Sequence, residues 1–257
     1  MKTIDKEIVK ARFGKNFHTY QNEASVQKNV AKRLADTLHH FQTEPMTRAL
    51  EIGCGTGFLT ENMWFSYDIG TYYLNDLVNP MSGEILKMAV DQAFYNYSFL
   101  PGDAELIQYP QHLDTIVSSS TVQWFGSLEK FSKKAAQALK TDGILAFSTF
   151  GTQNFREIKT TLGVGLDYSS PEELSSIFSE KFDLLHQDQW RQTLWLDSPW
   201  QVLRHIKTTG VNGCGKDFLG KEKLKKFEES YYANFSNSEG KVSLTYQPII
   251  CVMKARR

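Results

Sequence analysis

The sequence predicts an α/β fold: a doubly wound, mostly parallel sheet of seven strands with an N-terminal helix and a helical cap. Two observations lead to this fold class. Strand-like segments alternate with helix-like segments from residue 49 onward, an order that places helices on both faces of a parallel sheet. The first strand also runs into a turn with glycine at Gly53, Gly55 and Gly57, which is typical of a ligand-binding turn between strand and helix.

The elements of the first 150 residues are expected in a regular order. Apolar residues at helical spacing predict a helical segment over 5–40, which Pro45 closes. Short buried strands rich in β-branched and aromatic residues follow, with helices between them. The predicted strands are Ala49–Ile52, Thr71–Asp76, Tyr97–Leu100, Asp114–Ser118 and Ile144–Phe150, and amphipathic helices are predicted over 82–94 and 128–139.

The pattern is looser after residue 150. Ser170-Pro171-Glu172-Glu173 begins a helix, with serine as N-cap, proline at the first position and acids in the first turn. Two more helices are expected over 199–207 and 221–232, and two long strands over Phe182–Leu196 and Val242–Met253. The helices, mainly within 151–240, are expected to form a lid over the strand ends. Because no linker or repeat interrupts the chain, residues 1–257 are predicted to form a single domain.

The segment Leu50–Phe58 carries the most informative motif, an acid at Glu51 followed by glycine at alternate positions. A phosphate-binding P-loop would need Gly-Lys-Ser/Thr at its end, but Phe58 follows Gly57. A dinucleotide fingerprint would place its third glycine three residues after Gly55, where Phe58 stands. A carboxylate at the strand end instead suits a ligand that carries a cation. A glycine-rich turn without a ligand is the alternative.

Polar side chains stand at or just past four predicted strand ends, namely Glu51, Asp76, Asp103 and Ser119. The carboxyl ends of parallel strands meet at one edge of the sheet, where ligands bind. Asp76 follows the glycine motif by about 20 residues, the interval at which an acid meets ribose hydroxyls in nucleotide folds. Asp103 can accept from an adenine amine while the Ala104 N–H donates to the ring. For Asp76, a helix N-cap is the alternative.

Composition excludes several classes of protein. Lys and Arg together number 29, as do Asp and Glu, and this zero net charge argues against a general nucleic-acid binder. Three widely spaced cysteines, Cys54, Cys214 and Cys251, suggest reduced thiols and a cytoplasmic protein. No apolar run reaches the ~20 residues of a membrane span, and the N-terminus is unlike a signal peptide. The histidines lack zinc-ligand spacing, so no metal is expected.

Four further stretches are distinctive, namely Phe13–Tyr20 leading to Ala24 and Gln27; Asp114–Trp124; Thr193–Trp195 followed by Val202–Gly210; and Leu244–Gln247. With the glycine motif, they make the chain resemble the class I S-adenosylmethionine (SAM)-dependent methyltransferases. More narrowly, the chain resembles the BioC-type malonyl-acyl-carrier-protein O-methyltransferases of biotin synthesis. The glycine motif marks the superfamily only. Val-Gln-Trp and Leu-Arg-x-x-Lys-x-x-Gly are the more specific signals, and the resemblance spans nearly the whole chain.

The resemblance implies a Rossmann-like methyltransferase fold and a set of site residues. Those implied for the cofactor are Tyr20, Gln27, Glu51, Gly53, Gly55, Asp76, Met81, Asp103, Ala104 and Ser119. Those expected at the acceptor are Gln123 and Trp124, with Lys15, Arg204, His205 and Lys207 as candidates for holding an anion. The family often has asparagine where Ser119 stands and arginine where Lys15 stands. Lysine lacks the guanidinium fork, which puts a bidentate contact at Lys15 in doubt.

The implied reaction is SAM-dependent methylation of the free carboxylate of a malonyl thioester on acyl carrier protein. A carboxylate is already a nucleophile, so no catalytic general base is required. Acyl carrier proteins are acidic, and a basic rim should dock them. Two clusters could supply that rim, Lys130, Lys133, Lys134 and Lys140, and Lys221, Lys223, Lys225 and Lys226. Acids are interleaved nearby, so a charged helix surface is the favoured interpretation of each cluster. A monomer is expected, with no membrane or nucleic-acid partner.

Two other functions stay open at this point. A SAM-dependent methyltransferase for a free quinone or phenol would need a base near the methyl group, for which His18 or His205 are candidates. A SAM-binding protein without transferase activity is the second alternative. The intact acids at three strand ends argue against it.

Overall fold

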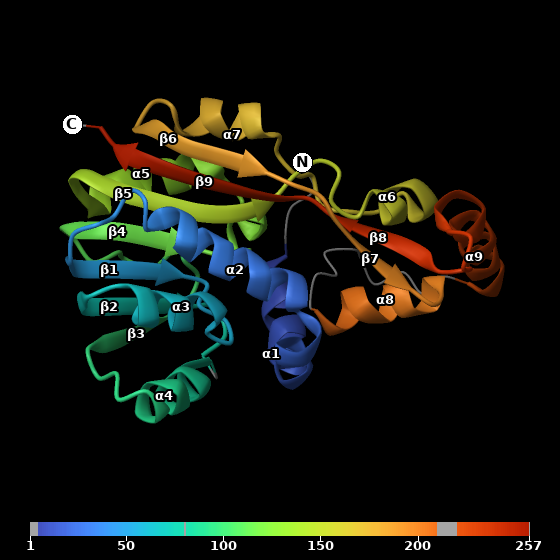
Figure 1. Cartoon of the computed structure of the whole chain (residues 1–257), viewed down its shortest axis with the longest axis horizontal. Coiled ribbons are helices and arrows are strands. Elements are labelled where there is room, and N and C mark those ends of the chain that lie inside the picture. Colours follow the sequence, from blue (N-terminus) through green and yellow to red (C-terminus); the bar gives the residue numbers. More distant parts are fainter. Residues whose placement is uncertain (1–4, 80, 210–219, 257) are drawn as a thin grey trace.

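The computed structural model describes residues 5–79, 81–209 and 220–256, without the side chains of 16–19, 22, 81, 82 and 221. Its centre is a seven-stranded sheet in the order β3-β2-β1-β4-β5-β9-β6 (Figure 1). These strands are β1 Met46–Ile52, β2 Ile69–Asp76, β3 Tyr97–Pro101, β4 Leu113–Ser118, β5 Leu139–Phe150, β6 Phe182–Gln189 and β9 Pro248–Ala255. The strands from β3 to β5 pair in parallel, while β9 is antiparallel to β5 and β6. The predicted fold class is therefore confirmed.

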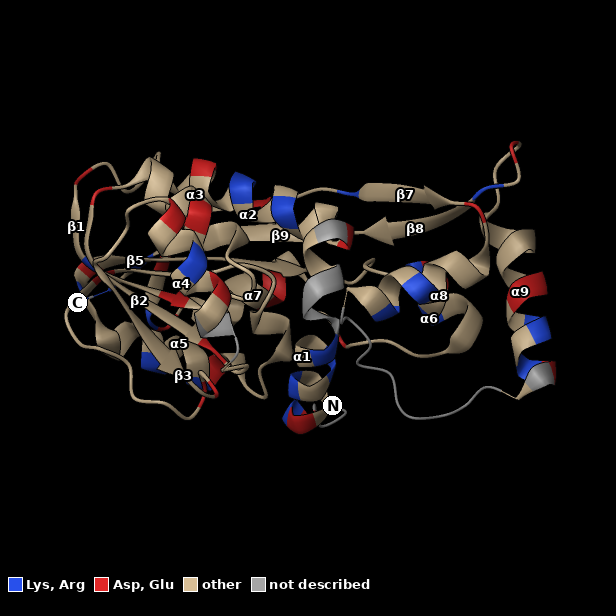
Figure 2. Cartoon of the chain, turned by 90° about the horizontal axis from the view of Figure 1, so that it is seen from below, with Lys and Arg blue, Asp and Glu red and all other residues tan. Residues whose placement is uncertain are grey.

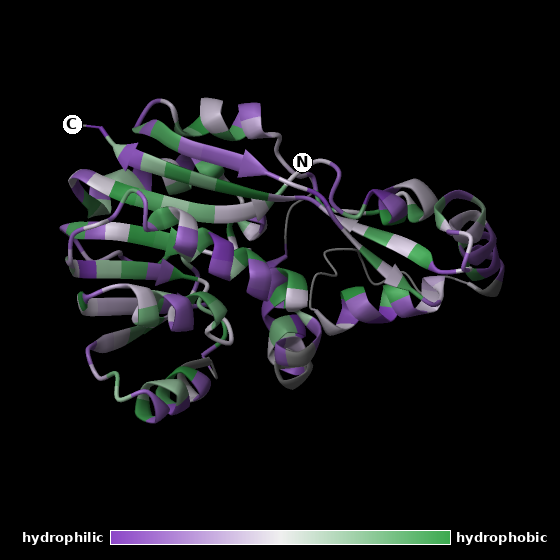
Figure 3. Cartoon of the chain, viewed as in Figure 1, coloured by the Kyte–Doolittle hydropathy of each residue, from purple (hydrophilic) through white to green (hydrophobic). Residues whose placement is uncertain are grey.

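Helices cover both faces of this sheet. One face carries α2 (Ser25–Leu38), α3 (Phe58–Ser66) and α4 (Met81–Asp91), and the other carries α5 (Leu128–Ala138) and α7 (Pro171–Phe178). Ala49 and Leu50 of β1 are both fully buried, and they belong to the cores on opposite faces because successive strand residues alternate. Figure 3 shows the apolar residues running along the central strands. The strand order reverses between β1 and β4, which is where the fold places a ligand.

The cap extends from one end of the sheet (Figure 1) and is not purely helical. It contains α6 (Arg156–Leu162), α8 (Pro199–Thr208) and α9 (Lys221–Phe235), together with a two-stranded antiparallel sheet of β7 (Gln192–Leu196) and β8 (Val242–Tyr246). Its core includes Val26 and Val30 from α2 and Phe150 from the end of β5. Because the cap shares this core with the sheet domain, we infer that the chain is one domain.

Two strand predictions were wrong in their extent. The predicted strand Phe182–Leu196 divides into β6 and β7, and the predicted strand Val242–Met253 divides into β8 and β9. In each pair the chain continues in nearly the same direction but passes from one sheet to the other (Figure 1). Strands β6 and β9 belong to the seven-stranded sheet, and β7 and β8 belong to the cap. At the crossing, the Trp190 N–H donates to the Pro248 carbonyl, and the Gln247 side chain bonds the Gln153 N–H and the Gln189 amide.

The N-terminal helical segment is two helices, α1 (Lys6–Glu23) and α2, separated at Ala24. The Asp5 side chain caps α1 by accepting from the N–H groups of Glu7 and Ile8. Helix α1 lies beyond the carboxyl ends of the strands, between the sheet and α8 (Figure 1). In the part of the chain that the structure describes, no helix is long and apolar enough to cross a membrane.

Candidate functional site

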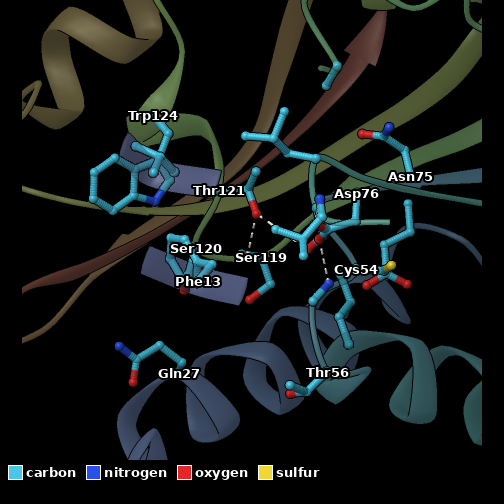
Figure 4. Close-up of a pocket in the computed structure, with 18 of the residues that line it drawn as sticks. Phe13, Gln27, Cys54, Thr56, Asn75, Asp76, Ser119, Ser120, Thr121 and Trp124 are labelled. Atoms are coloured by element: carbon cyan, nitrogen blue, oxygen red, sulfur yellow. Dashed lines mark hydrogen bonds between the residues drawn. The ribbon is translucent and has the colours of Figure 1, made fainter. Parts of the chain in front are cut away.

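A cavity lies at the carboxyl ends of β1, β2 and β4 (Figure 4). Residues of α1 form part of its wall. It collects residues from parts of the chain far apart in sequence. The predicted site residues that line it are Tyr20, Gln27, Glu51, Gly53, Gly55, Asp76, Asp103, Ala104, Ser119 and Trp124. The structure therefore brings the strand-end residues together in one cavity, as the sequence predicted.

The glycines of the turn after β1 have different roles. Gly53, Gly55 and Gly57 all have positive φ, at 70°, 53° and 92°. A Cβ on Gly53 would lie 2.2 Å from the Thr121 Oγ1, so packing against the β4 side requires glycine there. A Cβ on Gly55 would meet nothing within 4 Å, because this residue faces open space where it lines the cavity. Backbone N–H groups of Gly53 and Cys54 donate to the Asn75 carbonyl, which ties the turn to β2.

Asp76 holds the same turn from the end of β2. Its Oδ2 accepts from the Gly55 N–H and its Oδ1 from the Val78 N–H, both at 2.8 Å (Figure 4 shows the residue in the cavity). Burial raises the pKa of Asp76 to about 6, against the lowering effect of those two hydrogen bonds. Each carboxylate oxygen has a second lone pair, so Asp76 can shape the turn and also accept from a ligand hydroxyl.

Replacing Asp76 with alanine should weaken SAM binding by roughly 10- to 100-fold, the cost of losing hydrogen bonds to a charged group. Titration calorimetry would measure this loss. Asp76→Asn keeps the shape of the side chain and one of its two acceptor oxygens. The affinity of this variant for SAM should therefore lie between those of the wild type and of Asp76→Ala. Unfolding curves of both variants separate a collapsed turn from a lost ligand contact. Unchanged affinity in a folded Asp76→Ala variant would exclude Asp76 from the site.

Glu51, at the end of β1, is only 1% exposed. Its Oε2 accepts from the Tyr72 hydroxyl at 2.7 Å and from Thr60 Oγ1 at 2.9 Å. Burial raises the pKa of Glu51 to about 7, although these hydrogen bonds favour the ionised form. A buried carboxyl with such a pKa accepts a cation readily, because a nearby positive charge restores the ionised form.

Asp103, after β3, has a partner that the sequence did not suggest. Lys6 Nζ lies 2.6 Å from Asp103 Oδ1 and also pairs with Glu105. Lys6 sits in the first turn of α1, so this ion pair joins that helix to the rim of the cavity. The orientation of α1 places Lys6 and Lys10 on the wall of the cavity, and no sequence motif marks either lysine.

Three buried polar atoms on the cavity wall have no hydrogen-bond partner among the described residues. They are Gln27 Oε1, Thr56 Oγ1 and Ser120 Oγ. Figure 4 shows these side chains around the cavity. Because buried polar groups are rarely left unpaired, their position fits a polar ligand that supplies the missing donors or acceptors. Thr56 and Ser120 were not predicted, although both lie next to residues that were.

The residues expected at the acceptor are more scattered. Trp124 lines the cavity, while Gln123 faces a second cavity beside it. Lys15, Arg204 and Lys207 are exposed and line neither. His205 is buried on α8, with Nε2 2.8 Å from the Tyr246 hydroxyl, and burial lowers its pKa. The side chain of Met81 lies outside the described residues, as do those of the matching positions 16–19, including His18.

Comparisons with known proteins agree with this geometry. A family model described as a methyltransferase domain matches residues 50–147. A malonyl-acyl-carrier-protein O-methyltransferase from Bacteroides helcogenes is 38% identical, over 98% of this chain and 99% of that protein. The chain belongs to this family. A protein of the same name from Bacteroides fragilis is 36% identical over 98% of this chain, which spans about half of it (51%).

Solved structures share the fold at low sequence identity. The YcgJ protein from Bacillus subtilis has a TM-score of 0.64 and 16% identity, covering 88% of this chain and 99% of its own. The N-methyltransferase NodS from Bradyrhizobium japonicum, solved with S-adenosyl-L-homocysteine, has a TM-score of 0.54 and 12% identity, covering 93% of this chain and 99% of its own. These structures show the Rossmann-like fold expected from the sequence. The full-length relatives and the family model show that the chain is an enzyme of the methyltransferase class.

Proposed function

We propose that the chain transfers the methyl group of SAM to the free carboxylate of a malonyl thioester on an acyl carrier protein. The product is the methyl ester that primes biotin synthesis. The observation that carries the proposal is a single cavity where acids from three strand ends meet the glycine turn. The full-length similarity to malonyl-acyl-carrier-protein O-methyltransferases supports the choice of acceptor.

The cavity residues fit SAM by their chemistry. SAM supplies a methyl group that is already activated on a sulfonium. Glu51 would hold its ammonium group, Asp76 its ribose hydroxyls and Asp103 its adenine amine. The unpartnered Gln27 and Ser120 oxygens add acceptors on the same wall. Met81 stays a prediction for this pocket.

Aromatic side chains would exclude water from the reacting atoms. Tyr20 stacks on Phe58 with ring centroids 5.8 Å apart, and Phe13 meets the Trp124 ring edge-on at 6.0 Å. Both contacts join α1 to the sheet domain. Closing a site in this way strengthens the electrostatic interactions inside it and prevents hydrolysis.

The proposed acceptor needs no general base. A carboxylate oxygen forms the new C–O bond as the C–S bond breaks, and sulfur keeps the electron pair. A phenol or quinol would first have to lose a proton. His205 on α8 is the candidate base whose side chain the structure describes; it bonds the Tyr246 hydroxyl of β8 and does not line the cavity. Because His205 does not line the cavity, a carboxylate acceptor is favoured over a free phenol or quinol.

Both basic clusters suggested for carrier docking contain lysines that already make contacts within the chain. On α9, Lys225 and Lys226 pair with Glu229 and Glu222 of the same helix, and Figure 2 shows acids and bases interleaved there. In the other cluster, Lys140 pairs with Asp114 and Lys134 donates to the Ala104 carbonyl. Docking of the acidic carrier at either cluster would have to compete with these contacts.

Transfer of a labelled methyl group to malonyl-loaded acyl carrier protein tests the proposed function. We expect label on the carrier-bound acyl group, in a base-labile methyl ester, and none with an acetyl-loaded carrier that lacks the carboxylate. Transfer to a free phenol or quinol, with none to the malonyl carrier, would establish the alternative.

A further inference from the structure

A second cavity lies beside the cofactor cavity. Its walls come from α1, the turn η1 (Val122–Trp124), the start of α5, the loop 164–169 and α7. The two cavities share Lys6, Val9, Trp124 and Phe125 as lining residues. A molecule in the second cavity could therefore reach the end of the first without crossing the sheet.

Helix α1 presents adjacent faces to the two cavities. Asp5, Ile8 and Arg12 line the second cavity, at the spacing of one helix face. Lys6, Val9 and Phe13, one position further along, line the cofactor cavity. Arg12 therefore adjoins Phe13 and stands one turn from Val9, beside the junction.

Among the described residues, the second cavity is lined by four acids, Asp5, Glu105, Glu129 and Asp167, and by two bases, Lys6 and Arg12. Three of the acids have partners in the fold: Asp5 caps α1, Glu105 pairs with Lys6, and Glu129 accepts from the Ser127 hydroxyl. Of the two bases, Arg12 has the planar fork that matches a carboxylate. The guanidinium of Arg12 has five N–H donors, so it can hold a carboxylate in two parallel hydrogen bonds while keeping another contact.

The second cavity is also lined by a neutral polar side chain, Gln123. Gln123 Nε2 donates to the Ser120 carbonyl at 2.6 Å, and Thr149 Oγ1 donates to Gln123 Oε1 at 3.4 Å. These contacts fix the Gln123 amide on the strand side of the second cavity. The amide nitrogen has one more N–H that could meet a thioester carbonyl.

We infer that the second cavity is the acceptor site and that Arg12 binds the carboxylate to be methylated. This inference rests on the proposed function and names the residue that selects its substrate. Two hydrogen bonds from a cation would place the carboxylate without removing its nucleophilic electron pairs. The exposed candidates Lys15, Arg204 and Lys207 are then not needed for that contact.

The test compares a malonyl thioester with a butyryl thioester, which has similar size but no carboxylate. Arg12→Gln should lower kcat/KM for the malonyl carrier by about 10- to 100-fold, the cost of losing charged hydrogen bonds. Inhibition by the butyryl carrier and the affinity for SAM should not change. Arg12→Lys should recover part of the loss, because it restores the charge but not the fork. Lys28→Gln, an exposed lysine on α2, is the matched control.

The outcomes separate the inference from the proposed function. If Arg12→Gln keeps wild-type kcat/KM, or weakens malonyl and butyryl binding equally, Arg12 does not read the carboxylate. If Lys15→Gln abolishes the preference for malonyl instead, the anion site is at Lys15. A wild-type enzyme that methylates no malonyl carrier would overturn the proposed function itself.

Discussion

Gly53→Ala should destabilise the fold by about 2–5 kcal/mol, the sum of overpacking and a left-handed backbone. The new Cβ would lie 2.2 Å from Oγ1, 2.5 Å from Cγ2 and 2.8 Å from Cβ of Thr121. A rotation of the Thr121 side chain moves the first two atoms but not its Cβ. The φ of 70° at Gly53 adds strain of its own. Urea unfolding monitored by tryptophan fluorescence would measure the loss.

Gly55→Ala is the matched control for this prediction. Its φ of 53° brings the same backbone strain, but its Cβ would meet no atom within 4 Å. This variant should be destabilised by only about 1–2 kcal/mol. It should nevertheless bind SAM more weakly, because the alanine side chain would extend into the cavity. In Gly53→Ala/Thr121→Gly, the steric part of the loss should be recovered. Equal stabilities of the two single variants would contradict the packing role of Gly53.

The sequence was sufficient to predict the features that depend on local spacing. Buried strands with polar residues just past their ends located Asp76 and Asp103, and parallel pairing brings those ends to one edge. Ser170 was recognised as an N-cap from its neighbours, and in the structure it also forms a capping box with Glu173. Local chemistry determines these positions, so no tertiary information was needed.

Features set by tertiary packing were not predictable. The segments on both sides of Trp190 and of Gln247 are strand-like, and periodicity does not tell that a strand passes from one sheet to the other. The polar run 186–189 and Pro248 are the local signals of an interruption. Helix α1 has charged residues on several faces, and its docking alone decides that Lys6 reaches Asp103. The same docking brings Arg12 to the second cavity.

SAM affinity should depend on pH through Glu51, rising as the pH increases through about 7, its pKa in the ligand-free enzyme. The ammonium group of SAM favours the ionised carboxylate, so binding releases a proton below that pH. Below pH 7, the affinity for SAM should fall by up to about tenfold for each pH unit. Above about 8 it should fall again, because an α-amino group loses its proton with a pKa of roughly 7.7–8.0. Calorimetry between about pH 5.5 and 9, a range that extends about one pH unit or more beyond both pKa values, would trace this maximum.

Two variants identify the group that causes SAM affinity to fall at low pH, the acidic side of the pH profile. Glu51→Gln should bind SAM roughly 10- to 100-fold more weakly at neutral pH and lose the acidic side. Tyr72→Phe removes a hydrogen bond that lowers the pKa of Glu51, so the acidic side should move to higher pH. A Glu51→Gln profile that keeps its acidic side would assign it to another group, such as Asp76 with its pKa of about 6.

Stability should change in the opposite direction, which separates binding from folding. The pKa of Glu51 is raised in the folded state from 4.5 to about 7. Its contribution to stability is therefore fully present below pH 4.5 and is lost as the pH rises through 7. At pH 8, Glu51→Gln should unfold at the same or a higher urea concentration than the wild type, since it removes a buried charge. An enzyme that is more stable yet binds SAM poorly would identify Glu51 as a ligand-binding residue whose burial costs the fold stability.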